Sequence, residues 1–190
     1  ALEQGVTPKI CLEVAAEINR KVSVPLAFMS YYNPILYFGV NEFCEACSKS
    51  GIDGLIIPDL PPDEGDDVER ITRRCNLDLI YFLAPTSTAE RIALVARKSR
   101  GFIYLVSLTG VTGARQDLPV ELESFVRKVR QKASQPLCVG FGVSTPEQAR
   151  RIAAIADGVI IGSRIIQLLE EDRSLKALKA FAAGVRKALG

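Results

Sequence analysis

Residues 136–163 read PLCVGFGVSTPEQARRIAAIADGVIIGS, and this stretch decides the fold. An apolar run leads into two closely spaced glycines, a helix start, an amphipathic segment and a second apolar run. The hydroxyl of Thr145 can accept hydrogen bonds from free helix amides, and the carboxylate of Glu147 suits the positive end of the helix dipole. The stretch is therefore predicted to form strand, helix and strand, the repeating unit of a parallel sheet.

The same alternation extends through the rest of the chain. Apolar, β-branched runs are predicted as strands, and they occupy residues 24–29, 54–58, 77–83, 102–107, 136–139 and 158–161. Amphipathic stretches are predicted as helices at residues 7–20, 41–50, 62–75, 88–100, 119–133 and 145–156, with a terminal pair within 164–189. Strands that are apolar on both faces fit a parallel sheet covered by helices.

Two closures of such an α/β sheet remain open, a doubly wound sheet or a (β/α)8 TIM barrel. A dinucleotide-binding sheet is expected to carry GxGxxG after its first strand, but Gly140 and Gly142 come late and lack a third glycine. The barrel is therefore favoured. Six strands are found where a barrel needs eight and roughly 250 residues, so we expect a single barrel domain over residues 1–190 that lacks its first two βα units.

Composition excludes several classes of protein. The 190 residues carry 24 Lys plus Arg and 22 Asp plus Glu, a net charge of +2, which gives no electrostatic footprint for nucleic acid or an anionic membrane. No run approaches the ~18 apolar residues of a membrane span, and the first residues lack the layout of a signal peptide. We expect a cytoplasmic protein, or a stromal one if the source has plastids.

Histidine is absent, so Ser-His and Cys-His nucleophile pairs and HExxH zinc sites are excluded. The five cysteines are an odd number and are expected to be reduced thiols. Cys44 and Cys47 form a CxxC within a predicted helix, but no second CxxC follows to complete a zinc set. Buried helix thiols are favoured over a redox or metal role, and no metal site is predicted.

Residues that follow the strands carry the chemistry in a parallel barrel. Asp59 is the single carboxylate placed there and no lysine is, which argues against a metal cage and a Schiff-base aldolase. Glycines follow the last three strands, and Gly162 with Ser163 opens a helix. Because glycine lets backbone amides approach an anion, this edge is predicted to bind phosphate. The alternative is that each glycine makes a tight turn.

Four apolar residues beside the glycines, Tyr104, Phe141, Met29 and Ile56, are candidates for the walls of a slot for a flat ring. The alternative is that Tyr104, Met29 and Ile56 fill the layers inside the barrel.

The sequence resembles the tryptophan synthase alpha chain family in several motifs: YYNP at 31–34, PDLP at 58–61, LTGVTGA at 108–114, GFGVS at 140–144 and IGS at 161–163. The resemblance runs from residue 5 to the last helix. It implies a carbon-carbon lyase of tryptophan, and hence aromatic amino-acid, biosynthesis that cleaves indole-3-glycerol phosphate to indole and glyceraldehyde 3-phosphate. It implies no cofactor for this chain, but an alpha2beta2 complex with a pyridoxal-phosphate beta chain that consumes the indole.

The resemblance also implies roles for individual residues. Phosphate ligands are expected at Gly113, Gly142, Gly162 and Ser163, and the indole pocket at Tyr104, Phe141, Met29 and Ile56. Thr112 is expected to support loop closure, and Asn33 and Pro61 to face the partner chain.

No residue of this chain matches the two catalytic carboxylates of the family, which lie upstream of the stretch compared. Asp59 aligns with a strand-end aspartate that is not assigned the chemistry, so no catalytic residue is predicted within residues 1–190. Two other functions remain open. One is a related phosphate-binding barrel enzyme, such as a phosphoribosylanthranilate isomerase or indoleglycerol-phosphate synthase, and the other is a non-catalytic phosphate-binding module that activates a partner.

Overall fold

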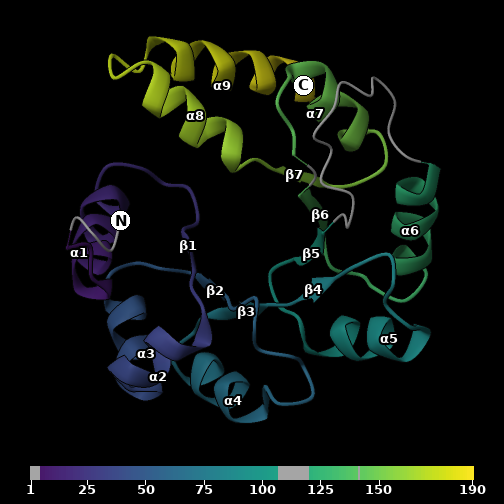
Figure 1. The fold of residues 1–190 in the computed structure, drawn as a ribbon. Coiled ribbons are helices and arrows are strands. Elements are labelled where there is room, and N and C mark those ends of the chain that lie inside the picture. The colour runs from purple at the N-terminus through teal and green to yellow at the C-terminus, as the bar shows by residue number, and fades with distance from the viewer. Residues whose placement is uncertain (1–4, 107–119, 141) are drawn as a thin grey trace. The chain divides into compact units, whose positions relative to one another are not determined.

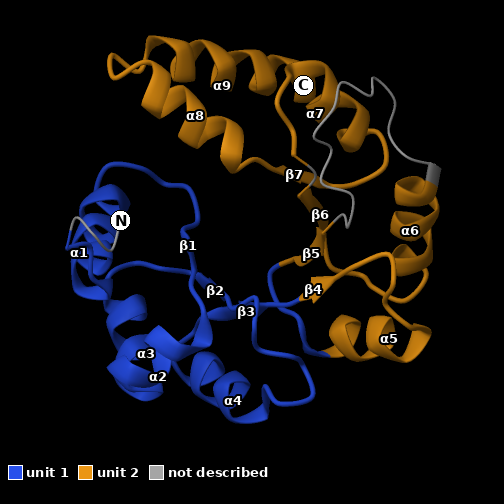
Figure 2. Cartoon of the chain, viewed as in Figure 1, with its two compact units in different colours: residues 1–81, 98–101 blue, residues 82–97, 102–190 orange. Residues whose placement is uncertain are grey.

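The structure is a computed structural model that describes residues 5–106, 120–140 and 142–190. Helices and parallel strands alternate along the chain (Figure 1). The chain forms two compact units (Figure 2). Unit 1 comprises Ala1–Tyr81 and Lys98–Gly101, and unit 2 comprises Phe82–Arg97 and Phe102–Gly190.

Unit 1 is built on a three-stranded parallel sheet in the order β1-β2-β3. Its elements are α1 (Pro8–Asn19), β1 (Ala27–Met29), α2 (Tyr32–Phe38), α3 (Val40–Lys49), β2 (Gly54–Ile56), α4 (Asp66–Arg74) and β3 (Asp78–Ile80). The register places Met29 beside Ile56, and Ile56 beside Ile80.

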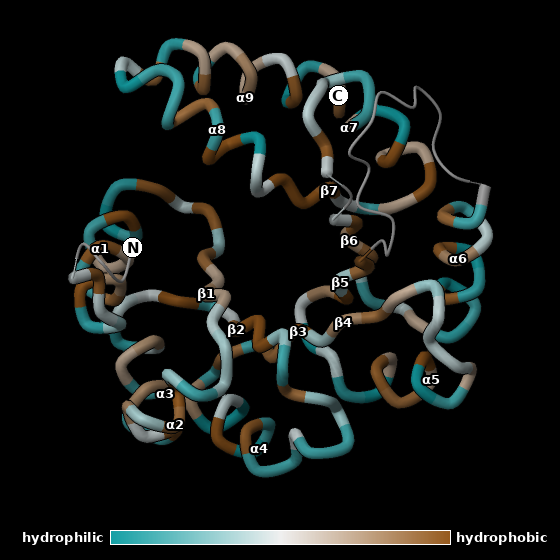
Figure 3. Tube along the Cα trace, in the orientation of Figure 1, coloured by the Kyte–Doolittle hydropathy of each residue, from teal (hydrophilic) through white to brown (hydrophobic). Residues whose placement is uncertain are grey.

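Unit 2 is built on a four-stranded parallel sheet in the order β4-β5-β6-β7. Its elements are β4 (Phe82–Leu83), α5 (Ala89–Lys98, whose last residue is counted with unit 1), β5 (Ile103–Val106), α6 (Val120–Arg130), β6 (Leu137–Gly140), α7 (Pro146–Ala153), β7 (Gly158–Ile160), α8 (Ser163–Glu171) and α9 (Lys176–Leu189). Strands β6 and β7 carry mainly hydrophobic residues, whereas much of α4 in unit 1 is hydrophilic (Figure 3).

The two faces of the unit 2 sheet differ in burial. Ile103, Leu105, Leu137 and Val139 have no exposed surface, whereas the residues that alternate with them on β5 and β6 are half-buried. Burying one such aliphatic side chain contributes about 1.5–3 kcal/mol. One face is therefore the core of this unit, and the other is partly exposed.

Threonine hydroxyls cap the predicted helix starts. Oγ1 of Thr145 accepts a hydrogen bond from the amide of Gln148 (3.2 Å), whose side chain accepts one from the amide of Thr145 (3.3 Å), and the pair forms a capping box. Oγ1 of Thr88 likewise accepts from the amide of Arg91 (3.2 Å) at α5. Both helix starts expected from the sequence are confirmed.

All six predicted strand runs contain strands, but three details of the prediction were wrong. Residues 77–83 form two strands, β3 and β4, which are separated at Tyr81. Helix α2 was not expected, because residues 31–33 were interpreted as a loop after a strand. Helix α4 begins at Asp66 rather than Pro62, because a turn closed by the amide of Glu64 and the carbonyl of Pro61 (3.0 Å) precedes it.

The CxxC cysteines lie on α3, where Cys44 and Cys47 have no exposed surface. Burial raises the pKa of each thiol to about 12. The interpretation as buried helix thiols is confirmed. Within the described ranges, no helix combines the length and apolar character needed to cross a membrane.

Candidate functional site

Two glycine-containing loops leave the same edge of the unit 2 sheet. Gly140 at the end of β6 is paired in register with Ile160 at the end of β7. Gly142 and Gly162 each lie two residues beyond that pair. The register therefore brings these two predicted phosphate ligands to one edge, as expected for neighbouring parallel strands.

Helix α8 starts at this edge with Ser163 as its first residue and Gly162 as its N-cap. No side chain among the described residues caps it. The carbonyl of Gly162 accepts hydrogen bonds from the amides of Ile165 (2.9 Å) and Ile166 (3.3 Å), so the turn is closed normally. The first amides of such a helix have no partner within the helix and attract negative charge.

The tight-turn interpretation explains Gly142 better than Gly162. Gly142 has a φ of +54°, which disfavours other residues, whereas the φ of −121° at Gly162 lies outside the left-handed region. A Cβ at either position would meet no described atom within 4 Å. The missing side chain at Gly162 therefore leaves the backbone of the α8 N-terminus accessible from outside.

The three described phosphate candidates, Gly142, Gly162 and Ser163, are uncharged and exposed. The nearest cation in sequence, Arg164, lies 3.7 Å from Glu171 in an ion pair. An anion held here would therefore be bound mainly by backbone amides.

Tyr104 lies on the open face of the same sheet. Its ring packs against Phe82, with 4.6 Å between the centroids and 32° between the planes. Its hydroxyl lies where a Cβ on Gly140 would come within 2.5 Å, so the absence of a side chain at Gly140 makes room for the phenol. Burial raises the pKa of the Tyr104 hydroxyl, which stays neutral at physiological pH. The half-buried ring offers an apolar surface beside the glycine loops.

Met29 and Ile56 lie in unit 1, where they are neighbours on adjacent strands. Ile56 is 8% exposed, as expected of a residue that fills a layer, whereas Met29 is 60% exposed and does not fill one. Three further predicted residues, Thr112, Gly113 and Phe141, lie outside the described residues.

The predicted partner residues Asn33 and Pro61 also lie in unit 1. Asn33 is exposed on α2 and lines an open, mainly apolar groove together with Pro8, Pro34, Leu36 and Tyr37. Pro61 is half-buried in the loop at residues 57–65, between β2 and α4.

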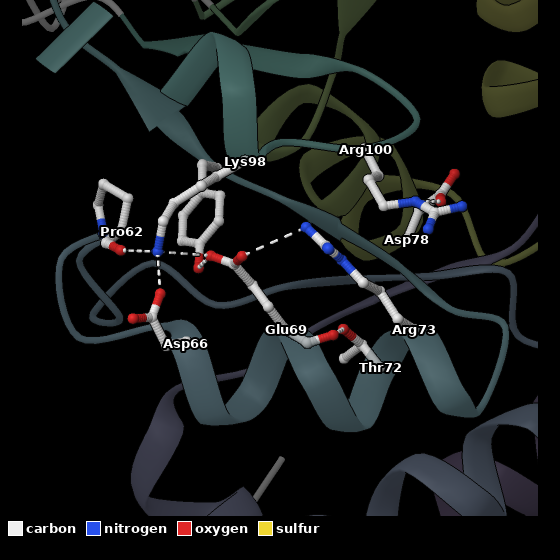
Figure 4. Close-up of polar contacts among 9 residues, drawn as sticks. Pro62, Asp66, Glu69, Thr72, Arg73, Asp78, Lys98 and Arg100 are labelled. Atoms are coloured by element: carbon white, nitrogen blue, oxygen red, sulfur yellow. Dashed lines mark hydrogen bonds and ion pairs between the residues drawn. The ribbon is translucent and has the colours of Figure 1, made fainter. Parts of the chain in front are cut away.

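The sequence did not point to a polar cluster beside this loop (Figure 4). Nζ of Lys98 lies 2.6 Å from the carbonyl oxygen of Pro62 and 3.0 Å from Oε1 of Glu69, and it also donates to Asp66. Burial opposes the charge on Lys98, but the hydrogen bonds to Asp66 and Glu69 outweigh it and raise the lysine pKa. Lys98 is 29 residues from Glu69 in the sequence, so no local spacing signals the contact.

Comparisons with known proteins give a consistent result. A model of the tryptophan synthase alpha chain family matches residues 1–188. The tryptophan synthase alpha chain of Dehalococcoides mccartyi is 56% identical over 189 residues, which cover 100% of this chain and 74% of that protein.

Solved structures match as well. The structure of Mycobacterium tuberculosis tryptophan synthase superposes with a TM-score of 0.91 at 36% identity, covering 99% of this chain and 71% of that chain. The tryptophan synthase complex from Pyrococcus furiosus matches with a TM-score of 0.87 at 29% identity, covering 100% of this chain and 76% of that chain. These matches, together with the parallel sheets, confirm the predicted fold class, an α/β chain of the (β/α)8-barrel type with six βα units.

Proposed function

Because the chain belongs to the tryptophan synthase alpha chain family, whose members are lyases of tryptophan biosynthesis, we propose that it serves the cleavage of indole-3-glycerol phosphate to indole and glyceraldehyde 3-phosphate. The family match favours this function over the isomerase, the indoleglycerol-phosphate synthase and the non-catalytic module. The observation that carries the proposal is the uncapped N-terminus of α8 at the glycine edge of the unit 2 sheet.

The phosphate of the substrate is proposed to bind at Gly142, Gly162 and Ser163, with Gly113 as a further ligand. Open space at both described glycines and the exposed position of Ser163 at the start of α8 support this assignment. A phosphate at a helix N-terminus gains from the backbone amides and from the helix dipole without needing a charged side chain.

The indole ring is proposed to lie on Tyr104. The phenol stands next to Gly140, two residues before the phosphate candidate Gly142, which suits a ligand with a ring at one end and a phosphate at the other. Phe141, Met29, Ile56 and the loop residue Thr112 belong to the same proposal through the family resemblance.

The chemistry itself requires two groups for which we propose no residue of this chain. An acid must protonate the indole ring carbon while a base takes the proton of the adjacent glycerol hydroxyl, and each such group supplies on the order of 10²- to 10⁴-fold. We propose that the two catalytic carboxylates of the family lie outside residues 1–190. The Dehalococcoides relative has about a quarter of its length beyond the match, which leaves room for them.

A tryptophan synthase beta chain is the proposed partner. The match to the Pyrococcus furiosus tryptophan synthase complex supports an assembly with other chains. Asn33 and Pro61 are proposed to face the partner, and the exposed apolar residues of the groove beside Asn33 support a docking role for α2.

Calorimetric titration with two ligands tests the function. Indole-propanol phosphate, which carries ring and phosphate, is expected to bind more tightly than glycerol 3-phosphate, which shares only the phosphate end. Failure of the chain to bind either ligand would contradict the proposal. Equal affinity for both would leave phosphate binding in place but remove the indole site.

A further inference from the structure

The polar cluster of unit 1 ties the loop at residues 57–65 to the end of α5 (Figure 4). The ammonium of Lys98 has three N–H donors and three acceptors around it: the carboxylates of Asp66 and Glu69 and the carbonyl of Pro62. Because one of these acceptors belongs to the main chain of the loop, Lys98 fixes loop backbone and not side chains alone.

The far side of the cluster is rigid. Oε1 of Glu69 also accepts a hydrogen bond from the hydroxyl of Tyr81 (2.8 Å), and Oε2 lies 3.6 Å from Arg73. Glu69 and Tyr81 are buried, the tyrosine being only 2% exposed. A buried carboxylate that loses its partners is strongly disfavoured, so these groups keep Lys98 in one place.

The other end of the loop is tied to α2. Oδ1 of Asp59 accepts a hydrogen bond from the amide of Tyr32 (2.8 Å), the first residue of that helix. The residue that precedes α2, Tyr31, provides no side-chain cap. The side chain of Asp59, 27 residues further along the chain, therefore caps the N-terminus of α2. Its negative charge also interacts favourably with the helix dipole.

The hydrogen bonds at Asp59 and at Pro62 lie on either side of Pro61 in the sequence. Asp59 also bonds to the first residue of α2, the helix that carries Asn33. We propose that Lys98 and Asp59 are positioning residues that hold the loop at residues 57–65 and α2 in the arrangement to which the beta chain docks. The inference rests on the proposed function, since Asn33 and Pro61 are its docking residues. It goes beyond that function by assigning the positioning of Asn33 and Pro61 to Lys98 and Asp59, which are not proposed to touch the substrate.

Binding of the purified beta chain to four variants tests the positioning role of Lys98 and Asp59. Asp59→Ala and Lys98→Met are each expected to weaken binding about tenfold or more, the loss typical of a charge-assisted hydrogen bond. Asp59→Asn is expected to stay within about twofold, because its amide oxygen still accepts from Tyr32. Arg100→Met is the matched control, since it removes an ion pair with Asp78 (3.1 Å) in the same unit.

Lys98→Met also removes the nearer of the two cations of the buried Glu69 and leaves only Arg73 at 3.6 Å, which by itself lowers stability. The double variant Lys98→Met with Glu69→Gln removes that charge and keeps an acceptor for Tyr81. If the double variant regains the unfolding midpoint of the parent but not its affinity for the beta chain, Lys98 acts by positioning the loop. If it regains both, Lys98 is only structural and the proposal fails.

Amide hydrogen exchange, measured in the absence of the beta chain, reports whether these hydrogen bonds hold the loop and α2. The amides of Tyr32, Asn33 and Ile35 in Asp59→Ala, and those of the non-proline residues within 59–65 in Lys98→Met, are expected to exchange about tenfold faster than in the parent and in Arg100→Met. Unchanged exchange would overturn the positioning role. Failure of the parent to bind the beta chain would instead overturn the proposed function and its docking surface, so the two failures are distinguishable.

Discussion

Gly162 and Tyr104 show how much a single residue decides at the glycine edge of unit 2. Neither is charged, and the binding role proposed for each depends on a bare backbone at Gly162 and on a flat ring at Tyr104. The sequence pointed to both, because glycine after a strand and an aromatic residue within one are local signals. The approach of the Tyr104 phenol to Gly140 was not predictable, since it joins residues of two strands that are 36 positions apart in the sequence.

Substitution of Gly162 tests the phosphate site. Gly162→Asp places a negative charge beside the bound anion, and at an effective dielectric near 20 a repulsion of about 4 kcal/mol at 4 Å amounts to a loss of more than about a hundredfold in affinity for glycerol 3-phosphate. Gly162→Ala is the control, because its Cβ meets open space and its φ is unstrained. Calorimetry that finds affinity retained in the aspartate variant would rule the site out.

Substitution of Tyr104 tests the indole site. Tyr104→Ala removes an aromatic surface and is expected to weaken binding of indole-propanol phosphate about ten- to a hundredfold, while inorganic phosphate binds as before. Tyr104→Phe keeps the ring and is expected to bind both ligands normally. Equal losses for the two ligands in the alanine variant would mean that Tyr104 belongs to the core alone.

At the scale of elements, local signals predicted most of the fold and non-local contacts account for the misses. Thr145 with Gln148 caps α7 from within four residues, and that helix start was predicted. Helix α2 was missed because its cap, Asp59, comes from a distant loop. The Lys98 cluster was missed for the same reason, since it joins residues of α4, α5 and the strand junction at Tyr81.

Helix α3 allows a test by thiol labelling. With pKa values of about 12, Cys44 and Cys47 remain neutral thiols far above physiological pH, and both are buried. Neither is expected to react with a disulfide reagent at pH 8 until the chain is unfolded, because the thiolate is the reactive form. Mass spectrometry identifies the labelled residues, and half-buried Cys11 and Cys75 provide the internal comparison. Rapid labelling of the native CxxC would contradict the buried-thiol interpretation.

At the scale of the whole molecule, β1 and β7 each lie at one end of a sheet. β1 pairs with β2 and β7 with β6, and each is the outer strand of its sheet in the described part of the chain. Helix α1 adds exposed apolar residues at a spacing of four, namely Ile10, Val14 and Ile18. Outer strands and apolar stripes of this kind favour association between copies. That all 190 residues act as one domain stays a prediction.

Fusion of upstream residues tests where the catalytic groups lie. The 190-residue chain alone is expected to release no indole from indole-3-glycerol phosphate at a useful rate, because the acid and the base are proposed to lie outside it. Adding upstream residues from the unmatched part of the Dehalococcoides relative is expected to give turnover. A monomer of the unextended chain that turns over at rates typical of the family would sink this prediction, and Asp59 would be the first residue to replace.

Gly140 and Tyr104 share one fixed volume between two neighbouring strands, since the phenol occupies the space that a side chain on Gly140 would need. A large side chain at position 104 on β5 therefore excludes a large side chain at position 140 on β6. Exchanging the pair, with alanine at 104 and a large residue at 140, would move the aromatic surface by one strand without changing the total occupied space. If the proposed ring site is correct, paired substitutions at these positions would alter the shape of ring that it accepts, whereas either change alone leaves a hole or a clash.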